Sequence, residues 1–215
     1  MKLVQNRGTD RVVDLMRPHL QPGHRLGCVT PSFSLFAFAE LRDALAKLEG
    51  VQLILPPADD ALDFLGGDGD RAARNRLQSR WLANQCAKWI SSTVELRRAQ
   101  GRVPQGAAVM SAPDGTVDQV VLGSFAFSTD GLGLTPGNPL NLIQASETAD
   151  EAAQLAHWLE QQWATLQAQP DSRTALVATL QGMGQHRAPF TLYAAILNHL
   201  FGSRDDEMDE ERIVK

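Results

Sequence analysis

From residue 89 to residue 156 the chain contains neither histidine nor lysine. The most informative motif of the sequence lies in this stretch, so it has no imidazole base and no primary amine available to it. Cysteine is scarce too: the two cysteines, Cys28 and Cys86, have no metal-binding spacing. Because one falls in a predicted strand and the other in a predicted helix, we expect two buried free thiols in a reducing cytoplasm.

Positive charge is also limited. Lys and Arg number 20 against 25 Asp and Glu, which leaves a formal net charge of −5. This balance argues against strong non-specific binding to DNA and leaves room only for a local basic patch. The sequence has no apolar run of transmembrane length, no signal-peptide apolar region and no Walker-type phosphate loop. We therefore expect a cytoplasmic protein without membrane contact, and no cofactor in this domain.

Apolar runs and amphipathic stretches alternate in the first part of the chain, which predicts an α/β domain. A turn at Asp114-Gly115 predicts that strands 107–111 and 119–122 are neighbours. We expect an α/β/α sandwich with a mixed central sheet over residues 1–202, followed by a charged linker at 203–215. The remaining expected strands are 24–30, 51–55, 94–99 and 140–145, and the expected helices are 9–20, 35–48, 70–92, 148–166, 171–181 and 190–201.

The tryptophans and histidines are interpreted as structural. Trp158 shares helical spacing with Leu155 and Leu159, and we expect it to be buried, together with Trp81, Trp89 and Trp163. None of the five histidines has a companion at metal or triad spacing, so we expect structural or surface roles for them.

Three hydroxyl residues, Thr30, Ser32 and Ser34, follow the first buried strand. Ligands bind at the carboxyl ends of strands in open α/β sheets, so these side chains are candidates for a site. The same residues are equally suited to cap the helix that follows, and we favour the cap.

Residues 106–129 carry the motif mentioned above. A strand, Gly-Ala-Ala-Val-Met, precedes Asp114, and a second strand ends in Gly123-Ser124 before an apolar, hydroxyl-rich turn. This layout resembles the second half of the phospholipase D signature, in which a His-x-Lys strand precedes an Asp and then a Gly-Ser-x-Asn stretch. Counting back from Asp114, the His position falls on Ala107 and the Lys position on Val109, while Ala126 stands at the Asn position.

The resemblance implies a phospholipase D fold without its nucleophile. In that family the His attacks phosphorus, and the Lys and the Gly-Ser-x-Asn groups hold the phosphate oxygens. Alanine and valine do neither, so we expect no catalytic residue here. The candidates for a degenerate phosphate site are Ser124, Ser128, Thr129 and Glu147. The alternative, which the pattern favours, is that Gly123-Ser124 only turns a strand into a loop.

The resemblance extends over the whole chain. Residues 4–41, 103–109 and 120–147 resemble the N-terminal domain of bacterial Swi/Snf-type superfamily-two helicases, and residues 208–213 resemble the segment that leads into their motor. In those proteins a degenerate phospholipase D-like domain precedes the ATPase. The resemblance implies a non-catalytic accessory domain that guides or regulates the engagement of DNA or a partner. The ATP-hydrolysing helicase motor of the same parent chain would then be its partner.

Arginines supply the only candidates for contact with nucleic acid, and we expect any DNA binding to be weak. A solvated helix face that balances nearby aspartates is the alternative, which the composition favours. The candidates are Arg74, Arg76, Arg80, Arg97 and Arg98, with Arg102 as an extension.

Two rival functions remain: a phosphodiesterase or nuclease with a non-standard active site, and a pure dimerisation module. A homodimer would use the apolar loop at 123–139, unless its large side chains are core, which we favour. Those side chains are Phe125, Phe127, Leu132 and Leu134.

Overall fold

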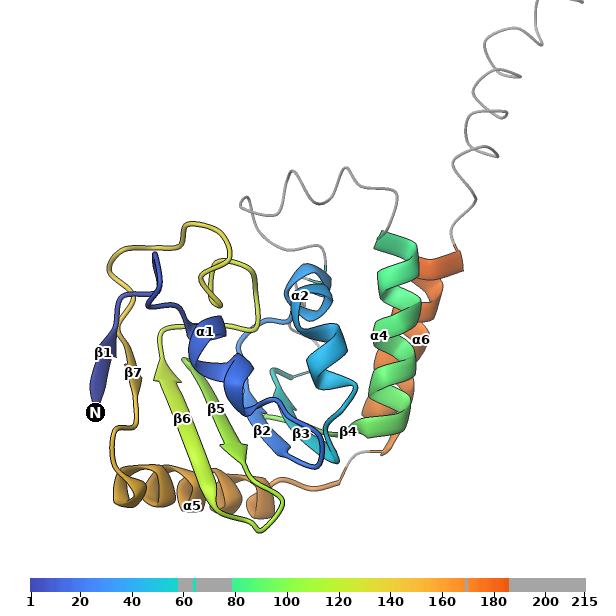
Figure 1. Cartoon of the computed structure of the whole chain (residues 1–215). Helices are drawn as coiled ribbons and strands as arrows, with labels where there is room; N and C mark the ends of the chain where they lie inside the picture. The colour runs from blue at the N-terminus through green and yellow to red at the C-terminus, as the bar shows by residue number, and fades with distance from the viewer. Residues whose placement is uncertain (58–63, 65–78, 169, 186–215) are drawn as a thin grey trace, which may run out of the picture. The chain divides into compact units, whose positions relative to one another are not determined.

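A seven-stranded mixed sheet runs through the protein in the order β1-β7-β6-β5-β2-β3-β4 (Figure 1). The computed structural model describes residues 1–57, 64, 79–168 and 170–185. The strands are β1 (Lys2–Val4), β2 (Arg25–Val29), β3 (Gly50–Leu55), β4 (Val94–Arg98), β5 (Gly106–Ser111), β6 (Val117–Gly123) and β7 (Ile143–Ala145). The mixed sheet and the α/β class are as predicted.

The sheet has a parallel half and an antiparallel half. Strands β2, β3 and β4 run parallel, while β5 is antiparallel to β2 and forms a hairpin with β6. The predicted pairing of 107–111 with 119–122 is therefore confirmed, and Gly115 in the turn has the positive φ of 87° that the tight reversal requires. Strand β1 was not predicted; it pairs with β7 across the register Leu3↔Gln144.

Helices cover both faces of the sheet (Figure 1). Helix α5 packs on one face, through a cluster that includes Ala156 and Leu159. The other helices contribute buried side chains to a larger cluster on the opposite face. The helices are α1 (Val12–Met16) with the 3₁₀ turn η1 (Arg17–His19), α2 (Leu35–Leu45), α4 (Ser79–Thr93), α5 (Ala149–Thr165) and α6 (Pro170–Gln185).

The first two helices are shorter than predicted. Helix α1 begins at Val12 rather than at residue 9, and its N-cap residue Arg11 makes no side-chain cap hydrogen bond. The Asp10 carboxylate instead accepts hydrogen bonds from Gln5 N and Lys2 Nζ. The chain then tightens into η1, which contains Pro18. Residues Met1–Gly184 form one compact unit. The expected helix 190–201, the linker 203–215, Arg74 and Arg76 lie outside the described residues.

Two of the tryptophan predictions were wrong. Trp158 is 40% exposed and Trp81 is 48% exposed, whereas Trp89 and Trp163 are buried as predicted. Helix α5 turns a different face to the sheet, because neighbouring helical residues point about 100° apart and only one of Trp158 and Leu159 can face inward. The buried residues of α5 are Ala152, Ala156, Leu159 and Trp163.

Both cysteines are buried free thiols, as predicted. Burial raises the pKa of the Cys28 thiol to about 12 and raises the pKa of Cys86 as well. Both therefore remain protonated and unreactive near neutral pH. Within the described parts of the chain, no helix has the length and apolar character needed to cross a bilayer.

Candidate functional site

The Gly123-Ser124 motif lies at the end of β6, where Gly123 pairs with Gly106 at the start of β5. Gly123 has a φ of 130°, and a Cβ added there would meet the Leu142 carbonyl oxygen at 2.2 Å. A Cβ on Gly106 would meet the Phe125 carbonyl oxygen at 2.5 Å. The glycines are therefore needed so that the loop after β6 can cross closely over the strand ends, which supports the turn interpretation of this motif.

The two positions to which the phospholipase D resemblance assigns His and Lys belong to a hydrophobic cluster. Ala107 is 5% exposed and Val109 is 6% exposed, and both belong to the cluster that includes Leu159 and Trp163 of α5. These two side chains face α5 because alternate residues of a strand point to the same side of the sheet. Unlike a site for a charged nucleophile, their surroundings are apolar.

Hydrogen bonds hold the loop after β6 against the loop after β2. The Phe127 backbone N–H donates to Thr30 Oγ1 at 2.7 Å, and Ser34 N donates to the Phe127 carbonyl at 2.8 Å. The Phe33 and Phe127 rings stack with centroids 5.0 Å apart. Ser34 Oγ also accepts from Phe36 N and caps α2, so the cap interpretation is confirmed for Ser34.

The apolar side chains of the same loop are core, which was the favoured alternative to a dimer contact. Phe125, Phe127 and Leu132 are each at most 3% exposed, and Leu134 is partly buried against the same cluster. They form no exposed patch for a second copy of the chain.

A pocket of about 520 Å³ opens at the end of the sheet where the carboxyl ends of β2 and β3 lie. It lies where β2 and β3 end and β5 begins, and the loops after β4 and β6 complete it. Its apolar wall includes Pro31, Pro56, Val103 and Pro104. Its polar lining residues are Arg102, Ser124, Ser128, Asp130 and Asn141.

Two of the four predicted phosphate-site residues meet in this pocket. Ser124 is exposed, and its hydroxyl makes no hydrogen bond to the described residues. Ser128 is buried; its hydroxyl donates to Asp130 Oδ1 at 2.6 Å and accepts from Gly131 N at 3.2 Å. Thr129 is buried outside the pocket lining, where its Oγ1 accepts from Thr135 Oγ1 at 3.1 Å.

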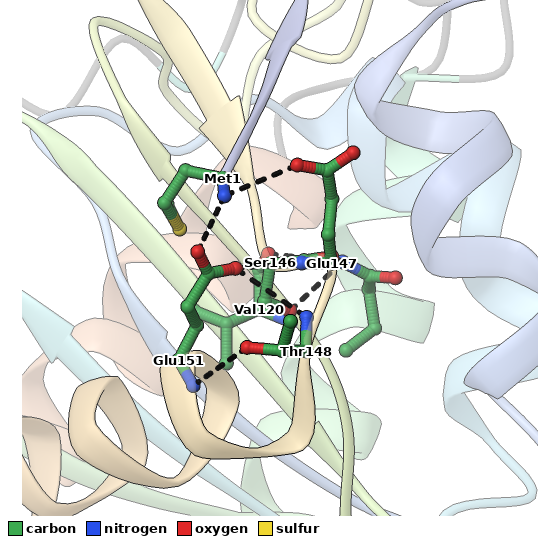
Figure 2. Close-up of polar contacts among 7 residues, drawn as sticks. Met1, Val120, Ser146, Glu147, Thr148 and Glu151 are labelled. Carbon is green, nitrogen blue, oxygen red and sulfur yellow. Dashed lines mark hydrogen bonds and ion pairs between the residues drawn. The ribbon is translucent and has the colours of Figure 1, made fainter.

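Glu147, the fourth, lies apart from them beyond the end of β7. Figure 2 shows it beside the N-terminal amine of Met1, with Glu147 Oε2 3.2 Å and Glu151 Oε1 2.5 Å from the nitrogen. Glu151 also completes a capping box with Thr148 at the start of α5. The two glutamates therefore fix the N-terminus of the chain to the start of this helix.

Two of the predicted arginines, Arg97 and Arg98, do not share one face of the sheet. Arg97 and Arg98 are consecutive in β4 and point to opposite faces of the sheet. The Arg97 guanidinium lies 4.3 Å from the Trp163 ring centroid and donates to the Trp163 and Leu166 carbonyls at the end of α5. Arg98 Nη1 donates to the Pro56 carbonyl at 3.0 Å, and burial lowers its pKa. Arg80 lies in α4.

Arg102 was predicted only as an extension of the arginine candidates, and the sequence predicted neither its place in the pocket nor two histidine contacts. Arg102 and Asn141 reach the pocket from loops that are far apart in sequence, which no local motif signals. His24 Nε2 and His19 Nδ1 lie 3.3 and 3.8 Å from Asp118 Oδ2, although their sequence spacing indicated no companion. In the described part of the chain, no group of three or more His, Cys, Asp or Glu residues is placed to hold a metal ion.

Comparison of the sequence with models of known protein families and with curated proteins gave no match.

The N-terminal amine gives a testable pH dependence. Its hydrogen bond to Glu151, with a second to Glu147, raises its pKa above the usual 8.0. While Glu151 is ionised, the ion pair therefore stabilises the fold fully below pH 8.0, and this contribution disappears as the pH rises through the folded-state pKa of the amine. An NMR titration of the amine is expected to show the raised pKa in the native chain and a lower pKa in Glu151→Gln. The exposed Glu160→Gln on α5 is the control; an equal shift there would contradict this assignment.

Proposed function

We propose that this chain is a non-catalytic, phospholipase D-like accessory domain of a Swi/Snf-type DNA-dependent ATPase, and that it engages DNA for the motor of its parent protein. The observation that carries the non-catalytic assignment is the burial of Ala107 and Val109 in the apolar cluster under α5. A phosphohistidine intermediate requires an imidazole that faces the pocket. Ala107 and Val109 instead have small apolar side chains that are buried under α5.

The pocket at the strand ends supports a binding role. It keeps an unengaged hydroxyl on Ser124 and an arginine, Arg102, at the place where the Gly-Ser turn meets the start of β5. A hydroxyl and a guanidinium side by side can bind an anionic ligand through hydrogen bonds without catalysing phosphoryl transfer. The α/β sheet with β5 and β6 as a hairpin also agrees with the fold that the resemblance implies.

The two rivals have less support. Among the residues that line the pocket, no histidine, lysine or cysteine is present to act as a nucleophile or base. The loop expected to form a dimer contact has its large side chains inside one chain.

Two measurements test the proposal. The purified chain is expected to cleave no chromogenic phosphodiester above the level of Ser124→Ala, because no histidine or lysine among the pocket-lining residues can activate the Ser124 hydroxyl. Metal-independent cleavage that Ser124→Ala abolishes would overturn the non-catalytic assignment.

Separately, the gene read past the codon for Lys215 is expected to encode a helicase motor, and a stop codon at that point would remove the motor context.

A further inference from the structure

We infer that the pocket beside Ser124 holds one unstacked cytosine nucleotide of a single DNA strand, with its phosphodiester at Arg102 and its amino group at Asp130. This inference rests on the proposed function and names the ligand of the same pocket.

Arg102 supplies the positive charge. It is exposed in the loop between β4 and β5, and it forms no hydrogen bond or ion pair with any described residue. Other surface arginines, such as Arg17 and Arg25, pair with carboxylates within 3.0 Å. A guanidinium without a carboxylate partner is suited to a phosphodiester oxygen. The exposed Ser124 hydroxyl in the same pocket adds a second donor.

Asp130 restricts what else can enter. Its Oδ1 accepts from the Ser128 hydroxyl, which leaves Oδ2 able to accept from a ligand. A carboxylate in the same pocket as the arginine disfavours a dianion, such as a terminal phosphate, and tolerates a singly charged diester. The base attached to the phosphodiester is neutral, and to bind beside Asp130 it must donate a hydrogen bond to the Asp130 carboxylate. Of the two pyrimidine bases, cytosine presents an N4 amino group that a carboxylate accepts, whereas thymine presents the O4 acceptor at that place.

The dimensions of the pocket match a base rather than a phosphate alone. Its volume of about 520 Å³ lies within the range of small-molecule sites. The rings of Pro31, Pro56 and Pro104 give it apolar surface against which a base can lie. A base reaches such a cavity only after it leaves the helical stack, which a single strand permits at lower cost than a duplex. The formal net charge of −5 also disfavours extended binding along a duplex backbone.

Fluorescence anisotropy of labelled oligo-dC, oligo-dT and a blunt duplex at low salt tests this inference on the 215-residue chain. Oligo-dC is expected to bind about tenfold more tightly than oligo-dT, as one specific base contact allows, and the duplex more weakly than either. Arg102→Glu is expected to remove binding of both strands. Asp130→Asn is expected to abolish the difference between oligo-dC and oligo-dT, because an amide serves either base edge.

Lys47→Glu is the matched control, because it replaces a positive by a negative side chain as Arg102→Glu does. Lys47 is exposed and lies just before β3 begins, at the opposite end of the strands from the pocket. Equal loss of binding in Lys47→Glu, equal affinity for oligo-dC and oligo-dT in the native chain, or duplex binding as tight as single-strand binding would each overturn the inference. The absence of DNA binding by the native chain would also overturn the inference. Circular dichroism checks that Arg102→Glu is folded, so that its loss of binding can be assigned to the side chain. That result would leave the cleavage assay and the gene sequence, which test the proposed function, unaffected.

Discussion

Replacing Ala107 with histidine is expected to destabilise the chain by ~3 kcal/mol and to create no phosphodiesterase activity. Ala107 is 5% exposed between Val29 of β2 and Leu122 of β6 and belongs to the cluster under α5. An imidazole adds volume to a packed core, and its two nitrogens lose water without gaining partners there. We therefore expect that this substitution alone does not supply the nucleophile of the phospholipase D family that the sequence resembles.

Urea unfolding and cleavage of a chromogenic phosphodiester measure the two parts of this prediction. Ala153→His is the matched control, since Ala153 is exposed on α5. It is expected to change the free energy of unfolding by about 0.5 kcal/mol or less. If Ala107→His were as stable as the control, the region around Ala107 would be more open than the packing indicates. Cleavage by Ala107→His would show that the remaining groups are sufficient for catalysis once a nucleophile is present.

The sequence predicted those parts of the fold that depend on local patterns. The β5–β6 hairpin was found because Asp114-Gly115 is a strong turn signal between two apolar runs. The start of α5 was predicted to within one residue, and in the structure Thr148 and Glu151 form a capping box there. Strand β1 was missed because three residues carry too little pattern, and only the pairing with β7 makes them a strand.

Tertiary packing decided what local patterns left ambiguous. Trp158 and Leu159 fit equally well on the buried face of a helix, and contact with β5 and β6 selected Leu159. The same limit applies to the candidate site. Ser124 and Ser128 were found because they belong to one motif, while Arg102 and Asn141 join them through chain folding alone.

Gly123→Ala is expected to destabilise the chain by ~3 kcal/mol, comparable to the loss at Ala107. The residue has a φ of 130°, which side chains rarely adopt, and the new Cβ would lie 2.2 Å from the Leu142 carbonyl oxygen and 2.9 Å from Ile143 Cα. That contact cannot open easily, because Ser124 N donates to the same carbonyl at 2.8 Å and Gly123 pairs with Ile143 in the sheet.

Gly101→Ala is the matched control for this substitution, since nothing lies within 4 Å of its added Cβ and its φ is not positive. It is expected to leave the free energy of unfolding unchanged or to raise it by about 0.5 kcal/mol. Thermal or urea unfolding of the three chains measures the difference, and equal stability of Gly123→Ala and Gly101→Ala would contradict the turn geometry.

Ser124→Ala separates the two roles of the motif: it is expected to retain native stability and to weaken oligo-dC binding. The glycine would then shape the turn, and the serine that follows it would contact the ligand.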